Sequence, residues 1–310
     1  MRFLDADAVA ALGPAGAVRA VTDALRGGLD PATDPPRTAV GLSHGQFLLM
    51  PSESPAAAGV KVATVAPGNP ARGLPRIQAT YLLFDRESLA LRAVLDGTAL
   101  TTLRTPAVSV AAVLHVLPDR PLRVAVVGAG PQATGHVATL AAVRPLAGAT
   151  HLVRDPSRTT LDAVRLGSPG ADEVLRTADV VVCATSARAP LFDSTLLGDG
   201  AVVIAVGSHE PDARELDAAL LGRATVVVED VATALREAGD VVLAIAEGTL
   251  IAEDLVPVRD VVTGSLRPPA DRPLVFKSVG MSWQDLVVAE AVVRTAAPDR
   301  GRHRASHRVV

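Results

Sequence analysis

Lysine is rare in this chain, and both of its lysines stand in unusual surroundings. Lysine and arginine together account for 30 of the 310 residues, but only Lys61 and Lys277 are lysine. In a chain that otherwise uses arginine, a retained lysine can indicate a need for a compact ammonium rather than a planar guanidinium. Lys61 leads into a run rich in glycine and proline, and Lys277 begins the sequence K-S-V-G. Lys61 is therefore a candidate for chemistry, whereas Lys277 fits a structural role beside an acid. Chance is the alternative for both.

A glycine-rich turn follows an expected strand and precedes an expected helix. The sequence V-A-V-V-G-A-G-P-Q-A contains the pattern G-x-G-x-x-A. The first glycine permits a tight turn, the second lets the backbone approach a pyrophosphate, and the alanine keeps the helix close to the sheet. The turn predicts a dinucleotide site made by Gly128, Gly130, Gln132 and Ala133; a purely structural turn is the alternative.

The end of the next expected strand bears on which dinucleotide binds. An acid at this place would hold the ribose 2′-hydroxyl of NAD, whereas cations would hold the 2′-phosphate of NADP. Here the chain presents Arg154, Ser157 and Arg158, which suit a phosphate. Asp155 is the competing acid, one position later than expected. We expect NADP(H), with NAD(H) as the alternative, and a solvated turn remains the alternative for Arg158.

Small polar residues and glycine also follow two other expected strands. Thr185 and Ser186 come after one Val-rich run, and Ser278 and Gly280 come after another. Because dinucleotides bind at the carboxyl ends of parallel strands, we expect these four residues near the nicotinamide. The single cysteine, Cys183, excludes an intramolecular disulfide and a cysteine-based metal site. The histidines form no ligand pattern, so we expect no metal.

The hydrophobic pattern predicts the elements that position these residues. Val-rich runs that are apolar on both faces indicate a parallel sheet covered by helices. We expect an α/β protein with a Rossmann-type doubly wound parallel sheet over residues 118–283. The expected strands are 123–127, 150–153, 180–184, 202–206, 225–228 and 274–276, with connecting helices at 133–143 and 211–221.

The flanking segments predict a second domain of mixed α+β structure. Strands are expected at 60–65, 77–84 and 89–95, separated by turns rich in proline and glycine. A helix at 98–116 leads into the nucleotide domain, and another at 283–297 packs back on the first. The second domain therefore combines residues 1–117 and 284–310.

Composition excludes several classes of function. A net charge of −3 gives no electrostatic case for binding nucleic acid or an anionic membrane. No apolar run approaches the roughly 18 residues that span a bilayer, and the N-terminus does not resemble a signal peptide. We expect a cytoplasmic protein whose basic tail, 300–308, is a solvated chain end.

The motifs together resemble the ornithine cyclodeaminase and mu-crystallin family. The resemblance covers nearly the whole chain, with separate motifs in the same order. It implies a homodimer formed through the non-nucleotide domain and an active site in the interdomain cleft. The matching segments are 36–38, 59–75, 97–105, 128–133, 207–216, 238–240 and 276–280.

The resemblance also implies roles for individual residues. Arg37 and Arg104 match the guanidinium groups that bind a substrate α-carboxylate, a task suited to a bidentate fork. Lys61 matches the active-site lysine, which could donate a proton if its pKa is lowered. Gly207 matches a position at the cofactor. For each arginine, an ion pair at the surface or between domains is the alternative.

Two positions depart from the family pattern. His209 stands where cyclodeaminases carry an acid, and it cannot supply a permanent negative charge, although a neutral imidazole can move protons near pH 7. Arg76 stands where ornithine-converting members carry a small hydroxyl residue. A cation there would repel an ornithine ammonium and favour a second acidic group on the substrate; a solvent-facing Arg76 is the alternative.

We therefore expect an NAD(P)H-dependent imine or ketimine reductase, or an amino acid dehydrogenase, acting on a small α-carboxylate substrate. The substrate would be an amino acid, imine or keto acid. Lys61, with His209, would transfer the proton at its nitrogen. A cyclodeaminase that recycles its nicotinamide is one alternative, which His209 disfavours. A non-catalytic binding protein is another, since a retained fold does not guarantee turnover.

Overall fold

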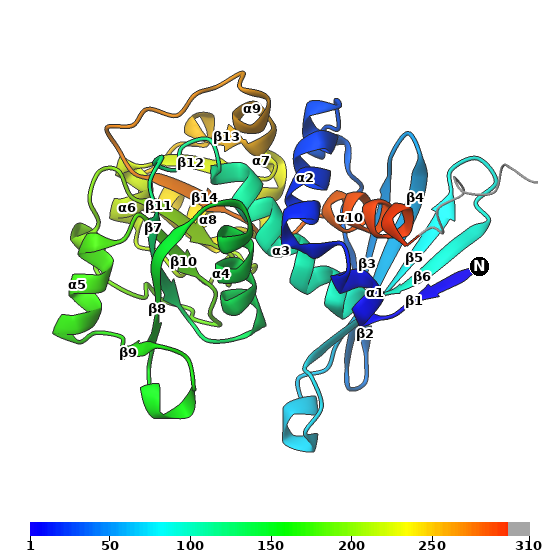
Figure 1. The fold of residues 1–310 in the computed structure, drawn as a ribbon, viewed down its shortest axis with the longest axis horizontal. Coiled ribbons are helices and arrows are strands. Elements are labelled where there is room, and N and C mark those ends of the chain that lie inside the picture. The colour runs from blue at the N-terminus through cyan, green and yellow to red at the C-terminus, as the bar shows by residue number, and fades with distance from the viewer. Residues whose placement is uncertain (297–310) are drawn as a thin grey trace, which may run out of the picture.

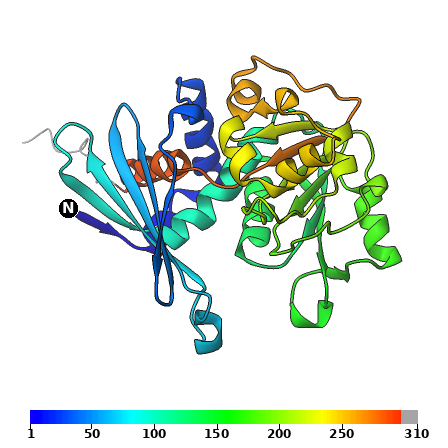
Figure 2. The ribbon, with the colours of Figure 1, turned by 180° about the vertical axis from the view of Figure 1, so that it is seen from behind.

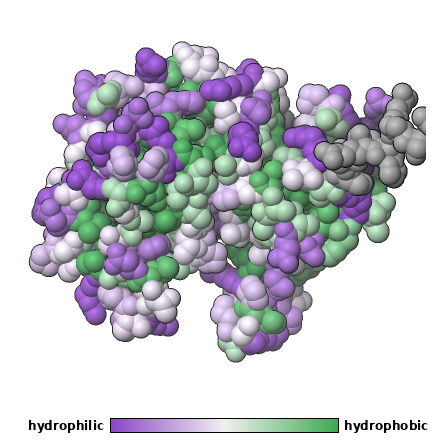
Figure 3. Space-filling view, viewed as in Figure 1, coloured by the Kyte–Doolittle hydropathy of each residue, from purple (hydrophilic) through white to green (hydrophobic). Residues whose placement is uncertain are grey.

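Two β-sheets lie side by side in the computed structural model, which describes residues 1–296 (Figures 1 and 2). Helices α2 (Gly13–Arg26) and α3 (Gly97–Val113) run between them. The space-filling view shows two lobes in broad contact, with an indentation between them at the lower edge (Figure 3). The basic tail at 300–308 lies outside the described residues.

The sheet in the N-terminal part of the chain is mixed, as expected. Its strand order is β1-β6-β5-β4-β3-β2, in which β1 is parallel to β6 and the other neighbours are antiparallel. The sequence predicts only β4, β5 and β6 of these strands. The bounds are β1 (Arg2–Leu4), β2 (Thr38–Leu42), β3 (Gly45–Glu53), β4 (Ala57–Val65), β5 (Ile77–Asp85) and β6 (Leu91–Asp96).

Helices cover one face of this sheet. Side chains alternate along β4, so that Ala57, Lys61 and Ala63 are buried on the same face. Helix α10 (Ser282–Thr295) packs on β3, β4 and β5 and also contacts α2 and α3. The short helix α1 (Ala6–Ala10) contacts α3 and β6. The alternation of β4 therefore places Lys61 on the face that α10 covers.

The second sheet is parallel throughout. Its order is β13-β12-β14-β11-β10-β7-β8-β9, so the chain leaves β7 toward one edge and returns at β10 toward the other. The expected Rossmann-type sheet is confirmed. The bounds are β7 (Leu122–Val127), β8 (Leu146–Val153), β9 (Ala163–Arg165), β10 (Val180–Cys183), β11 (Val202–Ala205), β12 (Thr225–Val228), β13 (Val256–Pro257) and β14 (Leu274–Lys277).

Both faces of the parallel sheet are buried. Val124 and Val126 of β7 belong to a hydrophobic cluster that continues into the N-terminal half, whereas Ala125 and Val127 belong to a second cluster on the opposite face. Cys183 lies in the second cluster, as expected of a small core side chain. The flanking helices are α4 (Pro131–Val143), α5 (Pro169–Thr177), α6 (Ala218–Arg223), α7 (Val231–Glu237), α8 (Gly239–Ala246) and α9 (Val258–Thr263).

Short 3-10 helices interrupt several connections. They are η1 (Pro31–Thr33), η2 (Asn69–Arg72), η3 (Pro156–Arg158), η4 (Ser194–Leu196) and η5 (Ala252–Asp254). The hairpin of β4 and β5 carries η2 at its tip and projects beyond the rest of the molecule (Figure 1).

The helix expected at 211–221 is largely wrong. Helix α6 begins only at Ala218, after Asp217, whose side chain caps it. The preceding amides of Glu215 and Leu216 instead donate to Asp240 Oδ1, each at 2.8 Å. A distant carboxylate therefore fixes this segment as a loop.

The expected domain division, 1–117 with 284–310 and 118–283, remains a proposal, which the two separate sheets support. Within residues 1–296, helices both long and apolar enough to cross a membrane are absent.

Candidate active site

The glycine-rich turn has the backbone that a dinucleotide site requires. Gly128 has φ +121°, and a Cβ there would lie 2.7 Å from the carbonyl oxygen of Ala184. Gly130 precedes α4, and a Cβ added to it would meet no described atom within 4 Å. Ala133 is fully buried, which lets α4 pack closely, while the Gln132 amide donates to a carbonyl of α3 at 3.5 Å. Open space in front of a helix N-terminus fits a pyrophosphate.

The carboxyl end of β8 presents exposed cations. Arg154, Ser157 and Arg158 are all exposed there. Asp155 accepts hydrogen bonds from the Ser157 backbone at 3.1 Å and from its hydroxyl at 2.7 Å. These bonds, led by that of the hydroxyl, lower the pKa of Asp155. The acid is therefore already engaged in its own turn, next to groups that suit a phosphate.

A buried carboxylate ties together the ends of β10 and β11. Glu215 accepts hydrogen bonds from the Thr185 amide and hydroxyl, each at 2.8 Å, and from the Gly207 amide at 2.7 Å. A Cβ on Gly207 would lie 2.4 Å from Glu215 Oε1, so glycine is required there. Ser186, one residue further, is exposed. Thr185 and Gly207 thus shape this edge of the sheet, and their contact with a cofactor stays a prediction.

Lys277 has the structural environment expected of it. Its ammonium lies 2.8 Å from Asp240 Oδ2 and donates to the Ser208 carbonyl at 2.6 Å. Lys277 and Asp240 are both fully buried, so each charge needs the other. The other carboxylate oxygen of Asp240 accepts a hydrogen bond from the Glu215 amide. Because Ser208 and Glu215 lie at the two ends of the loop that carries His209, Lys277 and Asp240 together hold this loop in place.

Lys61 forms a buried charge cluster with two residues from distant segments. Its Nζ lies 2.7 Å from Asp285 Oδ2 of α10, and Arg104 Nε of α3 lies 3.3 Å from Asp285 Oδ1. Lys61, Arg104 and Asp285 are 4, 5 and 0% exposed. One carboxylate therefore holds the expected proton donor and one expected carboxylate-binding group at the same place.

Burial lowers the pKa of Lys61 to about 8, and the positive charge of Arg104 acts in the same direction. Asp285 opposes this shift by stabilising the ammonium. Near neutral pH, Lys61 therefore carries a proton that it can release at small cost. This is the condition that a general acid must meet.

Glu229, which follows β12, organises the crossover between β14 and α10. It accepts hydrogen bonds from the Ser278 hydroxyl at 2.7 Å, from the Gly280 amide at 3.0 Å and from the amide of Gln284. Gln284 in turn accepts a hydrogen bond from Arg104 Nη1. Gly280 has φ +81°, and a Cβ there would lie 3.0 Å from the guanidinium of Arg104. Ser278 and Gly280 thus position Arg104, and their expected contact with the cofactor stays a prediction.

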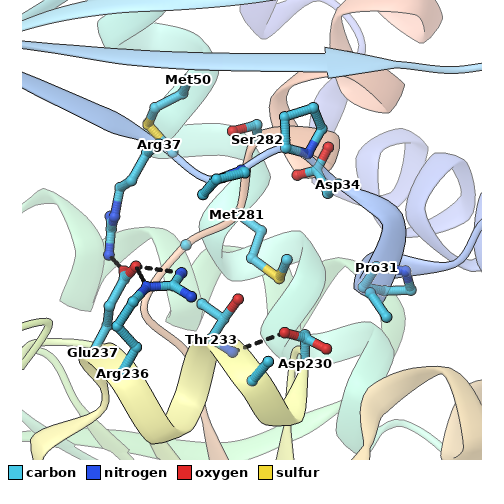
Figure 4. A pocket seen from close by; sticks show the side chains of 15 residues that line it. Pro31, Asp34, Arg37, Met50, Asp230, Thr233, Arg236, Glu237, Met281 and Ser282 are labelled. Atoms are coloured by element: carbon cyan, nitrogen blue, oxygen red, sulfur yellow. Dashed lines mark hydrogen bonds and ion pairs between the residues drawn. The ribbon is translucent and has the colours of Figure 1, made fainter.

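Arg37 crosses the cleft between the two halves of the molecule. Its Nη2 pairs with Glu237, the last residue of α7, and its Nη1 donates to the Val279 carbonyl at 3.4 Å. Both residues line a cavity of about 170 Å³ with Asp34, Met50 and others (Figure 4). In this structure Arg37 therefore forms the interdomain ion pair that is the alternative to substrate binding.

His209 follows β11 and lies within electrostatic range of Arg37. Its side chain is exposed, yet the partial desolvation by surrounding groups, followed by the charge of Arg37, lowers its pKa. His209 is therefore neutral at pH 7, so it can exchange protons but cannot replace a carboxylate.

Arg76 is separated from this cluster. Arg76 is exposed and immediately precedes β5 in the projecting hairpin. Its carbonyl accepts a hydrogen bond from the Ala66 amide. The described contacts do not join Arg76 to Lys61, Arg104 or Arg37, so its role with substrate stays a prediction.

Sequence reasoning misses the acids and the amide that organise the site. Glu229 follows a Val-rich strand, and Gln284 and Asp285 are adjacent polar residues in the largely apolar first turns of α10. That isolated polarity is the only sequence signal, because their partners lie 180 and 181 positions away.

Comparison with known proteins agrees with this architecture. The model of the ornithine cyclodeaminase/mu-crystallin family matches residues 15–299. Delta(1)-pyrroline-2-carboxylate reductase 2 of Burkholderia ambifaria is 32% identical over 84% of this chain and 83% of its own. The ketimine reductase mu-crystallin of Rattus norvegicus is 34% identical over 83% of each chain.

A solved structure extends the similarity to three dimensions. Delta(1)-pyrroline-2-carboxylate reductase of Thermococcus litoralis, in complex with NADH and L-proline, has a TM-score of 0.86 and 25% identity, covering 96% of this chain and 97% of its own. Taken with the two-sheet fold and the match over nearly the whole sequence, these similarities show that the chain belongs to the ornithine cyclodeaminase/mu-crystallin family.

Proposed function

We propose that the protein is an NAD(P)H-dependent reductase that converts a small imine with an adjacent carboxylate into the corresponding amino acid. Relatives named as pyrroline-2-carboxylate and ketimine reductases support this reaction class. The observation that carries the proposal is the buried cluster of Lys61, Asp285 and Arg104, because it places a titratable ammonium beside a carboxylate-binding guanidinium.

The cofactor would bind along the carboxyl edge of the parallel sheet. Gly128 and Gly130 leave room for the pyrophosphate at α4, and Arg154, Ser157 and Arg158 suit a 2′-phosphate. We therefore favour NADP(H), with NAD(H) as the alternative. When bound, the nicotinamide would supply the hydride that the imine carbon receives.

The residues of the chain would orient and protonate the substrate. Arg104, with Arg37, binds the carboxylate by charge-assisted hydrogen bonds. Lys61 donates a hydrogen bond to the imine nitrogen, which makes the C=N carbon more electrophilic, and its proton completes the amine. His209 would exchange protons with the substrate if it faces the site, but its neutral state disfavours the cyclodeaminase role.

We also propose a homodimer formed through the outer face of the six-stranded sheet. Strand register places Val60, Leu82, Val94 and Phe3 in one row on the face opposite Lys61. Phe3 is 75% exposed, and among the described residues no helix covers this face (Figure 2). An uncovered apolar sheet face indicates a protein interface.

The expected cytoplasmic location also stays a prediction.

The experiment is NADPH absorbance with purified protein and a panel of cyclic imines and keto acids with amines. Steady NADPH loss with one member supports a reductase. If no member causes NADPH loss, but ornithine incubated with a catalytic amount of NAD releases ammonia, the protein is instead a cyclodeaminase.

A further inference from the structure

Arg37 and Glu237 form an ion pair between the two halves of the molecule, beside the cavity that both residues line. Arg37 lies on the segment between η1 and β2, in the half that carries Lys61, whereas Glu237 ends α7 of the other half. Their side chains are 17 and 15% exposed, so the pair is still partly open to water. Figure 4 shows Arg37 reaching toward Glu237 along one side of the cavity.

Glu237 has a second guanidinium partner. Arg236 donates to Glu237 Oε1 through Nε at 2.9 Å and through Nη2 at 2.6 Å, whereas Arg37 contacts Oε2. Each carboxylate oxygen therefore has its own arginine. If Arg37 moved to another anion, Glu237 would keep both hydrogen bonds from Arg236 to Oε1, which reduces the cost of the exchange.

Two further arginines act electrostatically on Arg37. Its pKa is lowered first by desolvation, and the charges of Arg104 and Arg236 act in the same direction, against Glu229. The charges of Arg104 and Arg236 favour an anion beside Arg37, whereas Glu229 and the cavity residues Asp34 and Asp230 act against it. The neighbouring cavity of about 170 Å³ gives space for a small planar acid.

We propose that Glu237 occupies the position on Arg37 that the substrate's carboxylate takes, and that it thereby sets the affinity for substrate. On binding, the carboxylate displaces Glu237 from Arg37, and Glu237 stays on Arg236. This inference rests on the proposed role of Arg37 in substrate binding. It follows that an acid able to engage Arg104 as well as Arg37 displaces Glu237 more readily than an acid that reaches Arg37 alone.

The test is Glu237→Gln, which keeps the size of the side chain and removes its charge. Calorimetry would measure binding of pyrrole-2-carboxylate, a planar ring with a carboxylate next to nitrogen, to the protein saturated with NADP⁺. Because a partly exposed ion pair contributes up to about 1 kcal/mol, we expect binding to tighten by about fivefold. The matched control is Glu247→Gln, which breaks the partly exposed pair with Arg214, a pair outside the lining of the cavity, and should leave affinity unchanged.

A purely structural ion pair predicts the opposite result, because its loss would loosen the site and weaken binding. Unchanged or weaker binding by folded Glu237→Gln, or no binding by either protein, overturns the inference. Glu237→Asp provides a second variant. Its shorter side chain should keep the contact with Arg236 and lose the contact with Arg37, so this variant should also bind pyrrole-2-carboxylate more tightly than wild type. If the probe binds as expected but wild type consumes no NADPH with any imine, the proposed reaction fails and this inference stands.

Discussion

Asp285 is the residue on which the chemistry at Lys61 depends. It is fully buried and pairs with Lys61 at 2.7 Å and with Arg104 at 3.3 Å. Two cations so close together repel each other, and the carboxylate between them offsets that repulsion. Because burial outweighs this support, the pKa of Lys61 still falls to about 8. A single acid thus keeps the lysine charged at neutral pH and leaves its proton available.

Replacing Lys61 with Met should lower kcat by about 10²- to 10⁴-fold, the usual contribution of a positioned proton donor. Lys61 is protonated below its pKa, so the donor is present below about pH 8 and is lost as pH rises through that value. The kcat/KM of wild type should therefore fall above about pH 8 in a steady-state pH profile. Lys61→Arg is the matched variant: its cation does not titrate in this range, so any residual activity should lack that decline. A wild-type profile that stays flat to about pH 10 would contradict the assignment.

Replacing Asp285 with Asn should both inactivate and destabilise the protein. Removing one partner of a buried ion pair costs about 3–5 kcal/mol, because the remaining charges are left uncompensated. Urea unfolding would measure this loss against Asp271→Asn, an exposed acid in a loop. Equal stability of the two variants would show that Asp285 does not neutralise the cluster.

At the scale of elements, α10 and the crossover that precedes it bring the site together. The helix has no side-chain cap of its own, and Asp34 from the segment after η1 accepts a hydrogen bond from the Trp283 amide at 2.9 Å. Burial raises the pKa of Asp34 to about 6. Gln284 and Asp285 lie in the same first turn, so Asp34 fixes the residues that hold Arg104 and Lys61.

Replacing Asp34 with Ala should cost about 1 kcal/mol, the typical value of an N-cap. It should also raise KM, because Arg104 loses its fixed position. Asp34→Asn retains an oxygen acceptor and should restore most of both properties. Thermal unfolding and steady-state kinetics of the pair would check this. If Asn proved as damaging as Ala, the contribution of Asp34 would be its charge rather than its cap.

The sequence predicts elements well where the signal is local. The Val-rich strands and the turn at Gly128 follow from composition and periodicity, and they occur where expected. Strand β2 is missed because all five of its residues are exposed and show no alternation of burial. The helix at 211–221 fails because Asp240 takes the amides of Glu215 and Leu216.

The same distinction applies to the site. Lys61, Arg37 and Arg104 are identified by family motifs. The structure joins Lys61 and Arg104 through Asp285, and it places Arg37 on the cavity between the two halves. Their partners Asp285 and Glu237 carry no local signal, because pairing arises only when segments about 200 residues apart meet in the fold. Arg76 shows the converse: its place in a motif predicts the substrate pocket, but its side chain is exposed on a hairpin.

At the scale of the whole molecule, the proposed dimer should depend on the outer face of the six-stranded sheet. Leu82→Asp places a charge in the apolar row and should yield monomers, because an unpaired charge in an interface core costs several kcal/mol. Light scattering after size exclusion would measure the mass. Ile251→Asp, at an exposed position in the other half, is the control and should leave the mass unchanged. A dimer that survives Leu82→Asp would place the interface elsewhere.

An isotope label can follow the proposed hydride transfer to an imine carbon next to a carboxylate. NADPH carrying deuterium at the transferable position of its nicotinamide would be incubated with the protein and Δ1-pyrroline-2-carboxylate. Mass spectrometry should find proline with one deuterium on its α-carbon, and Lys61→Met should form almost none. Absence of labelled proline with folded, cofactor-bound wild type would contradict it.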